Sequence, residues 1–141
     1  MKCLKSTAHT RYDLRYHFVF LPHYRKRVLT GKVARSIEGM IRFASQINDW
    51  EIYELAVMQD HVHLYLGASP KWSPSQIMKI VKGGTSKKIT KMYPNLDEIY
   101  WGSNFWAVGY MVKSVGEATD KVISDYVRKQ KGEILTKTTD F

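Results

Sequence analysis

Apolar side chains recur along this chain with two different periods, and the two periods predict alternating strands and helices. In residues 14–20 every second side chain is apolar or aromatic, which is typical of a strand with one buried face. Residues 30–47 instead repeat their apolar positions every three or four residues, as an amphipathic helix does. Two more strands are predicted at residues 52–58 and 61–67, and the short link between them indicates a hairpin.

The second half of the chain continues this alternation. Residues 73–92 are predicted to be mostly helical, with an interruption at Gly83 and Gly84. Residues 105–115 are expected to form a fourth strand. Residues 117–131 form the last predicted helix, which has a glycine just before it and another just after it.

The predicted order is strand, helix, strand, strand, helix, strand, helix. Its first six elements match a split β-α-β unit, so we predict an α+β, ferredoxin-like (RRM-like) antiparallel sheet with its helices on one face. The seventh element is an additional C-terminal helix. The 141 residues fit a single domain over residues 1–141, and no repeat or long linker divides them. The other face of such a sheet is free for a ligand or a partner.

His61 and His63 are the most informative residues of the third predicted strand. Because side chains alternate across a strand, they share one face with Tyr65, while the apolar residues between them face the helices. Two neighbouring imidazoles can bind one divalent metal ion, which then polarises a phosphate oxygen. An isolated pair of this kind also occurs as two ordinary surface histidines. Asp60, just before the pair, either orients a ligand or serves only as a turn residue.

Tyr126 and Gln130 are four residues apart on the last predicted helix and therefore lie on one of its faces. A tyrosine hydroxyl can attack phosphorus when a base or a metal-polarised phosphate assists it, and a glutamine oxygen can bind the same metal. The alternative is structural. Tyr126 continues a ridge with Ala118 and Val122, so it also fits the end of an apolar stripe.

The charge of the chain favours a nucleic-acid partner. There are 22 Lys and Arg residues against 13 Asp and Glu, a formal net charge of +9, which predicts a polyanionic partner. Lysines cluster on the second predicted helix, at Lys79, Lys82, Lys87, Lys88 and Lys91. Lysines neutralise phosphates and glycine allows close backbone approach, although a solvated basic face has the same pattern. Trp101 and Trp106 would stack on unpaired bases if exposed, and Trp106 is expected in the core.

Two further features of the sequence indicate the cellular compartment of the protein. Cys3 is the single cysteine, so no disulfide can form within the chain, and a reducing cytoplasm is expected. The apolar run at residues 17–21 is too short for a signal peptide or a membrane span, so no membrane contact is expected.

Taken in order, several short motifs resemble those of the small single-tyrosine HUH transposases of bacterial and archaeal insertion sequences, including their REP-associated relatives. Together they extend over nearly the whole chain. The motifs are Tyr16-His17-Phe18-Val19-Phe20, Tyr24-Arg25-Lys26-Arg27, Asp60-His61-Val62-His63-Leu64, Lys82-Gly83-Gly84-Thr85-Ser86, Trp101-Gly102-Ser103-Asn104-Phe105-Trp106, Ser114-Val115-Gly116 and Tyr126-Val127-Arg128-Lys129-Gln130.

The resemblance implies roles for individual residues. His61 and His63 would be the metal-binding pair, Gln130 the third metal ligand and Tyr126 the nucleophile. The metal would be Mg²⁺ or Mn²⁺, and the partner a single-stranded DNA with a hairpin at the end of the element. The protein would act as a homodimer, in the cytoplasm and at the nucleoid. The residues implied in DNA binding are Tyr24, Arg25, Arg27, Lys79, Lys82, Gly83, Ser86, Lys87 and Lys88.

The implied activity is metal-dependent cleavage and rejoining of insertion-sequence ends through a 5′-phosphotyrosine intermediate. Such an intermediate conserves the bond energy, which agrees with the lack of a P-loop motif in the sequence. The alternative is a non-catalytic or domesticated hairpin-binding protein of the same fold. The aromatic pattern of an RRM is missing from the central strand, where the two histidines stand instead, and a two-histidine phosphoesterase would need a second H-x-H motif.

Overall fold

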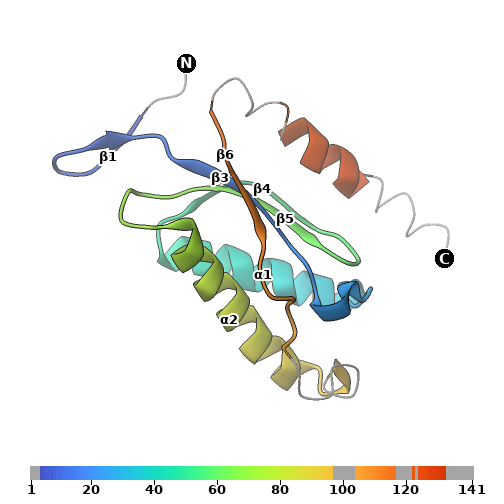
Figure 1. The fold of residues 1–141 in the computed structure, drawn as a ribbon. Helices are drawn as coiled ribbons and strands as arrows, with labels where there is room; N and C mark the ends of the chain where they lie inside the picture. The colour runs from blue at the N-terminus through green and yellow to red at the C-terminus, as the bar shows by residue number, and fades with distance from the viewer. Residues whose placement is uncertain (1–3, 97–103, 117–121, 123, 133–141) are drawn as a thin grey trace.

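A four-stranded sheet with helices on both sides forms the protein. The fold comes from a computed structural model that describes residues 4–96, 104–116, 122 and 124–132. Helices α1 (Gly31–Ile47) and α2 (Pro74–Met92) cover one face of the sheet, and a helix that includes residues 124–132 lies on the opposite side (Figure 1). The strands of the sheet are β3 (Arg15–Phe20), β4 (Glu51–Val57), β5 (Val62–Gly67) and β6 (Met111–Ser114).

The strand order confirms the predicted fold class. The sheet runs β4-β5-β3-β6, and each neighbouring pair is antiparallel. This is the ferredoxin-like order, in which the first and third strands are central. The predicted hairpin is confirmed as well, because β4 pairs with β5 from Val57 opposite Val62 to Glu51 opposite Gly67. A small separate sheet of β1 (Lys5–Ser6) and β2 (Arg11–Tyr12) was not predicted from the sequence.

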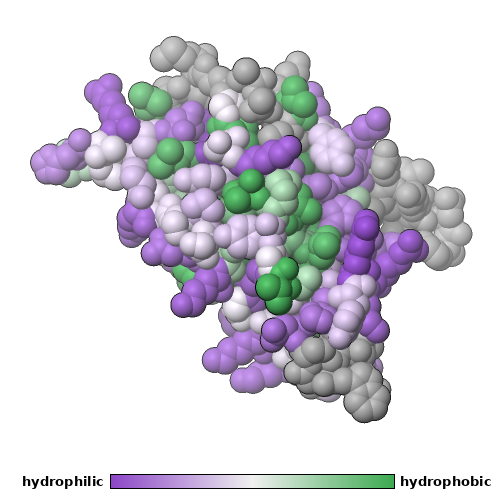
Figure 2. All heavy atoms as spheres, in the orientation of Figure 1, coloured by the Kyte–Doolittle hydropathy of each residue, from purple (hydrophilic) through white to green (hydrophobic). Residues whose placement is uncertain are grey.

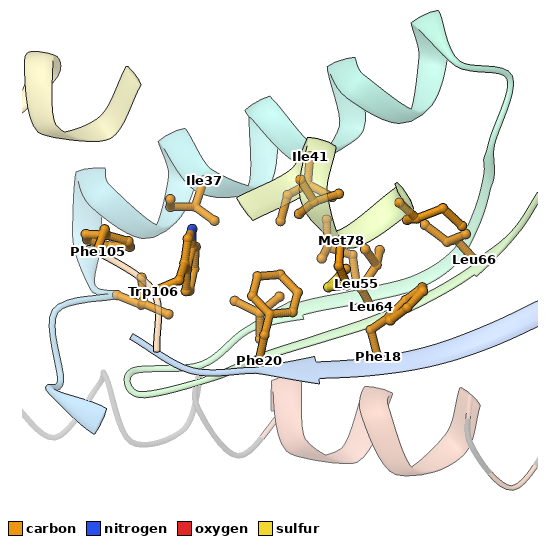
Figure 3. Close-up of a cluster of buried hydrophobic side chains, with 14 of the residues drawn as sticks. Phe18, Phe20, Ile37, Ile41, Leu55, Leu64, Leu66, Met78, Phe105 and Trp106 are labelled. Atoms are coloured by element: carbon orange, nitrogen blue, oxygen red, sulfur yellow. The ribbon is translucent and has the colours of Figure 1, made fainter. Parts of the chain in front are cut away.

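The core lies between the sheet and the two covering helices. Alternate residues of the central strands point into it, including Phe18 and Phe20 of β3 and Leu64 of β5, as the period of two predicts (Figure 3). Ile37 and Ile41 of α1 meet them from the helical layer. Side chains alternate along a strand, so the residues between these apolar positions point to the opposite face of the sheet. The predicted histidine pair is expected on that opposite face.

Helix α2 is continuous, so the predicted interruption at Gly83 and Gly84 is wrong. Two glycines in a helix interior cost roughly 1 kcal/mol each relative to alanine. The buried stripe of α2 nevertheless continues past them, through Val81, Thr85 and Ile89. Burial of this stripe against the core therefore outweighs the local preference of glycine. The predicted start is confirmed, because α2 opens with proline after a capping serine.

The fourth strand is shorter than residues 105–115, which corrects another prediction. Only Met111–Ser114 form β6, and the preceding residues follow a different path. Phe105 and Trp106 are buried in the core, which confirms the expectation for Trp106. The strand-like backbone pairing of Trp106 is an isolated bridge with Pro22, outside the sheet. Gly109 then has a φ of +87°, a left-handed conformation that interrupts an extended strand.

The described part of the last predicted helix, residues 122 and 124–132, is helical, which agrees with the prediction over that part. Residues 117–121 and 123 lie outside the described residues, as do Cys3 and Trp101. None of the described helices is both long and apolar enough to cross a lipid bilayer.

Candidate functional site

Three imidazoles gather on the face of the sheet opposite the core. His61 lies in the turn before β5 and His63 lies in β5, and their ring centroids are 4.9 Å apart. His17 of β3 stacks on His63, with centroids 5.4 Å apart and an angle of 11° between the rings. His63 is only 5% exposed and His17 is buried too. The predicted pair is therefore brought together in a cluster with His17, in which His63 is buried and His61 is partly exposed.

Each histidine of the pair has its Nδ1 atom engaged by a neighbour. Nδ1 of His61 lies 2.7 Å from a carboxylate oxygen of Asp60, and Nδ1 of His63 lies 3.2 Å from Nε2 of His17. The other oxygen of Asp60 accepts a hydrogen bond of 3.1 Å from Nε of Arg25. Asp60 thus contacts a predicted ligand as well as occupying the turn. The Nε2 atoms of both histidines are left on the side away from these contacts.

The C-terminal helix is fixed over β4 by one apolar and one ionic contact. Val127 is 1% exposed and forms a small cluster with Ala56 and Met58, separate from the main core. Arg128 makes an ion pair with Glu54, next to an irregularity in the pairing of β4. These contacts place neighbouring residues of the helix beside the histidines.

Tyr126 stands at the edge of the histidine cluster. Its ring centroid is 5.7 Å from that of His63, with the two planes at 84°. Its side chain is 50% exposed, and Val122 is exposed as well, so neither belongs to a buried stripe. The apolar-stripe interpretation of Tyr126 is therefore wrong for the described residues, and Val127 takes the buried position. The hydroxyl of Tyr126 remains accessible to a ligand.

Gln130 bridges the tyrosine and the histidines. Its amide Nε2 donates a hydrogen bond of 2.6 Å to the hydroxyl oxygen of Tyr126. Its amide oxygen is buried and has no hydrogen-bond partner among the described residues, and the same holds for Nε2 of His63. Buried polar atoms are rarely left unpaired in a folded protein, so each such atom needs an explanation. Two unpaired electron-pair donors on adjacent elements form a set that could bind a cation.

The electrostatics of the cluster keep these donors neutral. Burial lowers the pKa of His63 to about 4, the neighbouring His61 and His17 act in the same direction, and a weaker side-chain contact with Gln130 opposes them. Burial, followed by the positive charge of Lys113, lowers the pKa of His17. For Asp60, burial opposes ionisation, but its contacts with His61 and Arg25 outweigh burial and lower the pKa of the carboxyl group. Near neutral pH the imidazoles of His63 and His17 are therefore uncharged, and Asp60 is a carboxylate.

No group of three His, Cys, Asp or Glu side chains that would bind a metal occurs in the part of the chain that the structure describes. Gln130, a side chain of another kind, contacts His63 of the predicted pair. The sequence did not single out His17, or the ion pairs of Arg25 and Arg128. The signal for His17 was its polar side chain on the same face as Arg15, in an otherwise apolar strand.

The chain was compared with known proteins. The family model for IS200-like transposases matches residues 10–130. The chain belongs to the IS200-like transposase family. It is 35% identical over 119 residues to the ISDra2 transposase TnpA of Deinococcus radiodurans, covering 84% of this chain and 85% of that protein. It is 36% identical over 126 residues to the transposase for insertion sequence element IS200 of Salmonella typhimurium, covering 89% and 82%.

Solved structures agree with this assignment. The crystal structure of a candidate transposase from Deinococcus radiodurans matches with a TM-score of 0.75 and 33% identity, over 90% of this chain and 98% of that one. A REP-associated tyrosine transposase bound to a REP hairpin shares the fold, with a TM-score of 0.59 and 17% identity over 86% and 70% of the two chains. The activity of this IS200-like transposase is therefore DNA transposition, with cleavage and transfer of DNA strands.

The predicted DNA-binding residues of the transposase occupy two regions. Tyr24, Arg25 and Arg27 are exposed at the turn after β3, and Tyr24 and Arg25 both have positive φ angles. Through its bond to Asp60, Arg25 connects this turn to the histidine cluster. The second region lies along α2. The predicted DNA-binding residues that are exposed there are Lys79, Gly83, Lys87 and Lys88.

Lys82 differs from the other lysines of α2. Its ammonium group donates to the carbonyl oxygens of Ala107 and Gly109, at 2.7 and 3.0 Å. It therefore connects α2 to the segment before β6, and burial lowers its pKa. With Gly83 and Ser86 it also lines a groove between α2 and that segment. DNA contact by these residues remains a prediction.

Proposed function

We propose that this transposase cuts and rejoins single-stranded DNA with Tyr126 as its nucleophile, assisted by a divalent metal ion bound by His61, His63 and Gln130. The observation that carries the proposal is the position of Gln130. One end of its amide donates to the Tyr126 hydroxyl, and the other end is a buried oxygen beside the imidazole of His63 that makes no well-formed hydrogen bond to the described residues. A single side chain thus links the proposed nucleophile to the proposed metal ligands.

The donor atoms fit a divalent metal ion. Neutral imidazole nitrogen is a ligand for first-row divalent metals, and an amide oxygen suits Mg²⁺ or Mn²⁺, with water completing the shell. The unpartnered Nε2 of His63 and amide oxygen of Gln130 are the atoms that such an ion would satisfy. When bound, the ion supplies charge neutralisation and polarisation at the scissile phosphate. Mg²⁺ and Mn²⁺ are the ions that the resemblance implies.

Tyr126 and Gln130 then account for the cleavage and rejoining steps. The hydroxyl oxygen of Tyr126 attacks phosphorus, the bond from phosphorus to the 3′ oxygen breaks, and a 5′-phosphotyrosine and a free 3′-hydroxyl result. The hydrogen bond from Gln130 stabilises the negative charge that develops on the tyrosine oxygen as its proton leaves to water at the exposed side. Attack by a 3′-hydroxyl on the phosphotyrosine reverses these bond changes and rejoins a strand.

We further propose that the substrate carries a hairpin at the element end and that the protein acts as a homodimer in the cytoplasm, at the nucleoid. The exposed basic residues of α2 and of the turn after β3 support DNA binding. The relative described as bound to a REP hairpin supports a hairpin. Strand β6 is an edge strand, and its apolar Met111 and Val112 are partly exposed. Figure 2 shows apolar side chains on the face over which β6 runs in Figure 1, which supports a partner copy at that edge.

A covalent-capture assay tests the catalytic part. Labelled single strands that contain the hairpin end of the element are incubated with protein and Mg²⁺ or Mn²⁺, then separated on a denaturing gel. We expect a metal-dependent protein–DNA band from the wild type and none from Tyr126→Phe or in excess chelator. Hairpin binding without any covalent band would instead identify a non-catalytic binder, and a band that survives Tyr126→Phe would identify another nucleophile.

A further inference from the structure

His17 has no role in the steps described above, although it touches a proposed metal ligand. It lies on β3, one strand away from His63, and its Nε2 atom is 3.2 Å from Nδ1 of His63. The two rings are nearly parallel and both side chains are buried. Apart from His17, no other hydrogen-bond partner of His63 Nδ1 is found among the described residues. The orientation of the His63 ring therefore depends on this contact.

The contact has two possible arrangements of hydrogen atoms. A neutral imidazole carries one hydrogen, on either Nδ1 or Nε2, and its other nitrogen has a free electron pair. If His17 donates to His63, then Nδ1 of His63 is an acceptor and its Nε2 must carry the hydrogen, which prevents that nitrogen from binding a metal. If His63 donates from Nδ1 to His17, its Nε2 keeps a free electron pair directed at the site.

His61 shows how the same choice is made on the other ligand. Its Nδ1 atom faces a carboxylate oxygen of Asp60 at 2.7 Å, and an ionised carboxylate only accepts hydrogen bonds. The neutral form of His61 then donates from Nδ1 and keeps the electron pair on Nε2. Histidines that bind metals usually have such an outer partner, which fixes both the hydrogen position and the ring orientation. No carboxylate faces His63 in the described residues, and His17 occupies the equivalent place.

We propose that His17 is a positioning residue that accepts the Nδ1 hydrogen of His63 and thereby keeps Nε2 of His63 free to bind the metal. The proposal rests on the proposed function in one respect, because it assumes that the metal is bound by His63. It assigns no contact between His17 and the metal or the DNA. The two proposed histidine ligands are then oriented by different groups, His61 by a carboxylate and His63 by an imidazole.

Three variants separate this role from a general effect on folding. His17→Phe keeps a stacked ring but offers no acceptor, whereas His17→Gln places an amide oxygen at a reach similar to that of Nε2. Tyr65→Phe is the matched control, because Tyr65 is directly opposite His17, is fully buried, and loses a hydroxyl that accepts a hydrogen bond of 3.4 Å from Arg15. Mn²⁺ affinity of the full chain is measured by electron paramagnetic resonance of the free ion. We expect His17→Phe to weaken it about 10- to 100-fold, His17→Gln to recover most of the loss, and Tyr65→Phe to leave it unchanged.

A second measurement on metal-free protein distinguishes failure of this proposal from failure of the metal site. The ¹⁵N shifts of the His63 ring show which nitrogen carries hydrogen, and we expect Nδ1 in the wild type and in His17→Gln. Hydrogen on Nε2 in the wild type, or undiminished Mn²⁺ affinity of His17→Phe, would overturn the role of His17. If the wild type binds no Mn²⁺ but His63 has hydrogen on Nδ1, the metal site is wrong while the contact stands. If His17→Phe does not fold, the wild-type and His17→Gln spectra decide.

Discussion

Acid should destabilise the metal-free protein because His63 and His17 are buried in the uncharged form. His63 has a pKa of about 4 in the folded protein, against 6.5 for an ordinary histidine. Between these two values the unfolded chain binds a proton that the folded chain does not. Stability therefore rises with pH in this range, and it is lost as pH falls from about 6.5 toward 4. The lowered pKa of His17 acts in the same direction.

The size of the effect follows from the two pKa values. At pH 5 an ordinary histidine is almost fully protonated, whereas His63 with a pKa of about 4 is mostly neutral. Linkage then gives a loss of about 2 kcal/mol for His63 between pH 7.5 and pH 5, approaching about 3 kcal/mol at still lower pH. Asp60 contributes little to this window, because its carboxyl pKa is lowered from an ordinary value of 3.8 and its effect appears at more acidic pH.

Urea denaturation with chelator present measures the loss. The free energy of unfolding is determined at pH 7.5 and pH 5 for the wild type and for His63→Gln, which cannot titrate at that position. We expect the difference between the two pH values to be smaller in His63→Gln by about 2 kcal/mol, whatever the absolute stability of the variant. Equal pH dependence in the two proteins would show that His63 is not buried as a neutral group and would refute the reasoning.

Three further predictions concern contacts that position the helices. The buried indole N–H of Trp106 donates a hydrogen bond of 2.8 Å to the hydroxyl of Thr85, and Thr85→Val leaves it without this partner. We therefore expect the free energy of unfolding, measured by urea denaturation, to fall by about 1–3 kcal/mol. No measurable fall would contradict this prediction. Val127→Ala removes most of the apolar contact that fixes the C-terminal helix, so we expect several-fold slower formation of the covalent band with unchanged hairpin affinity. Glu54→Gln breaks an ion pair whose arginine is exposed to solvent, so it should cost no more than about 1 kcal/mol of stability. An unchanged rate in Val127→Ala would show that the helix is positioned by other contacts.

The sheet and the side of it that carries the histidines were predictable from the sequence. A strand has a strict period of two, so the apolar residues that flank His63 determine which way the imidazole points. The same logic placed Phe18 and Phe20 in the core, and both are buried there. Helical spacing likewise put Tyr126 and Gln130 on one face of the last helix, and they form a hydrogen bond in the structure.

The features that were missed depend on contacts between distant parts of the chain. Helix α2 continues through its two glycines because Thr85 and its neighbours are buried, and burial of this kind is not visible in local preferences. The choice of Val127, and not Tyr126, as the buried residue depends on where the helix meets β4. The contact between His17 and His63 depends on the register of two adjacent strands, which the sequence alone does not specify.

The most direct test of the central proposal is to locate the bond between protein and DNA. After reaction with a cleavable single strand, the adduct is digested with nuclease and trypsin and analysed by mass spectrometry. The tryptic peptide of residues 122–128 contains Tyr126 as its single tyrosine, together with one serine at position 124. We predict a nucleotide attached through the phosphate to Tyr126 in this peptide, formed with Mg²⁺ or Mn²⁺ and missing after chelation. Attachment to any other residue, or no modified peptide from a protein that binds the hairpin, would contradict the account.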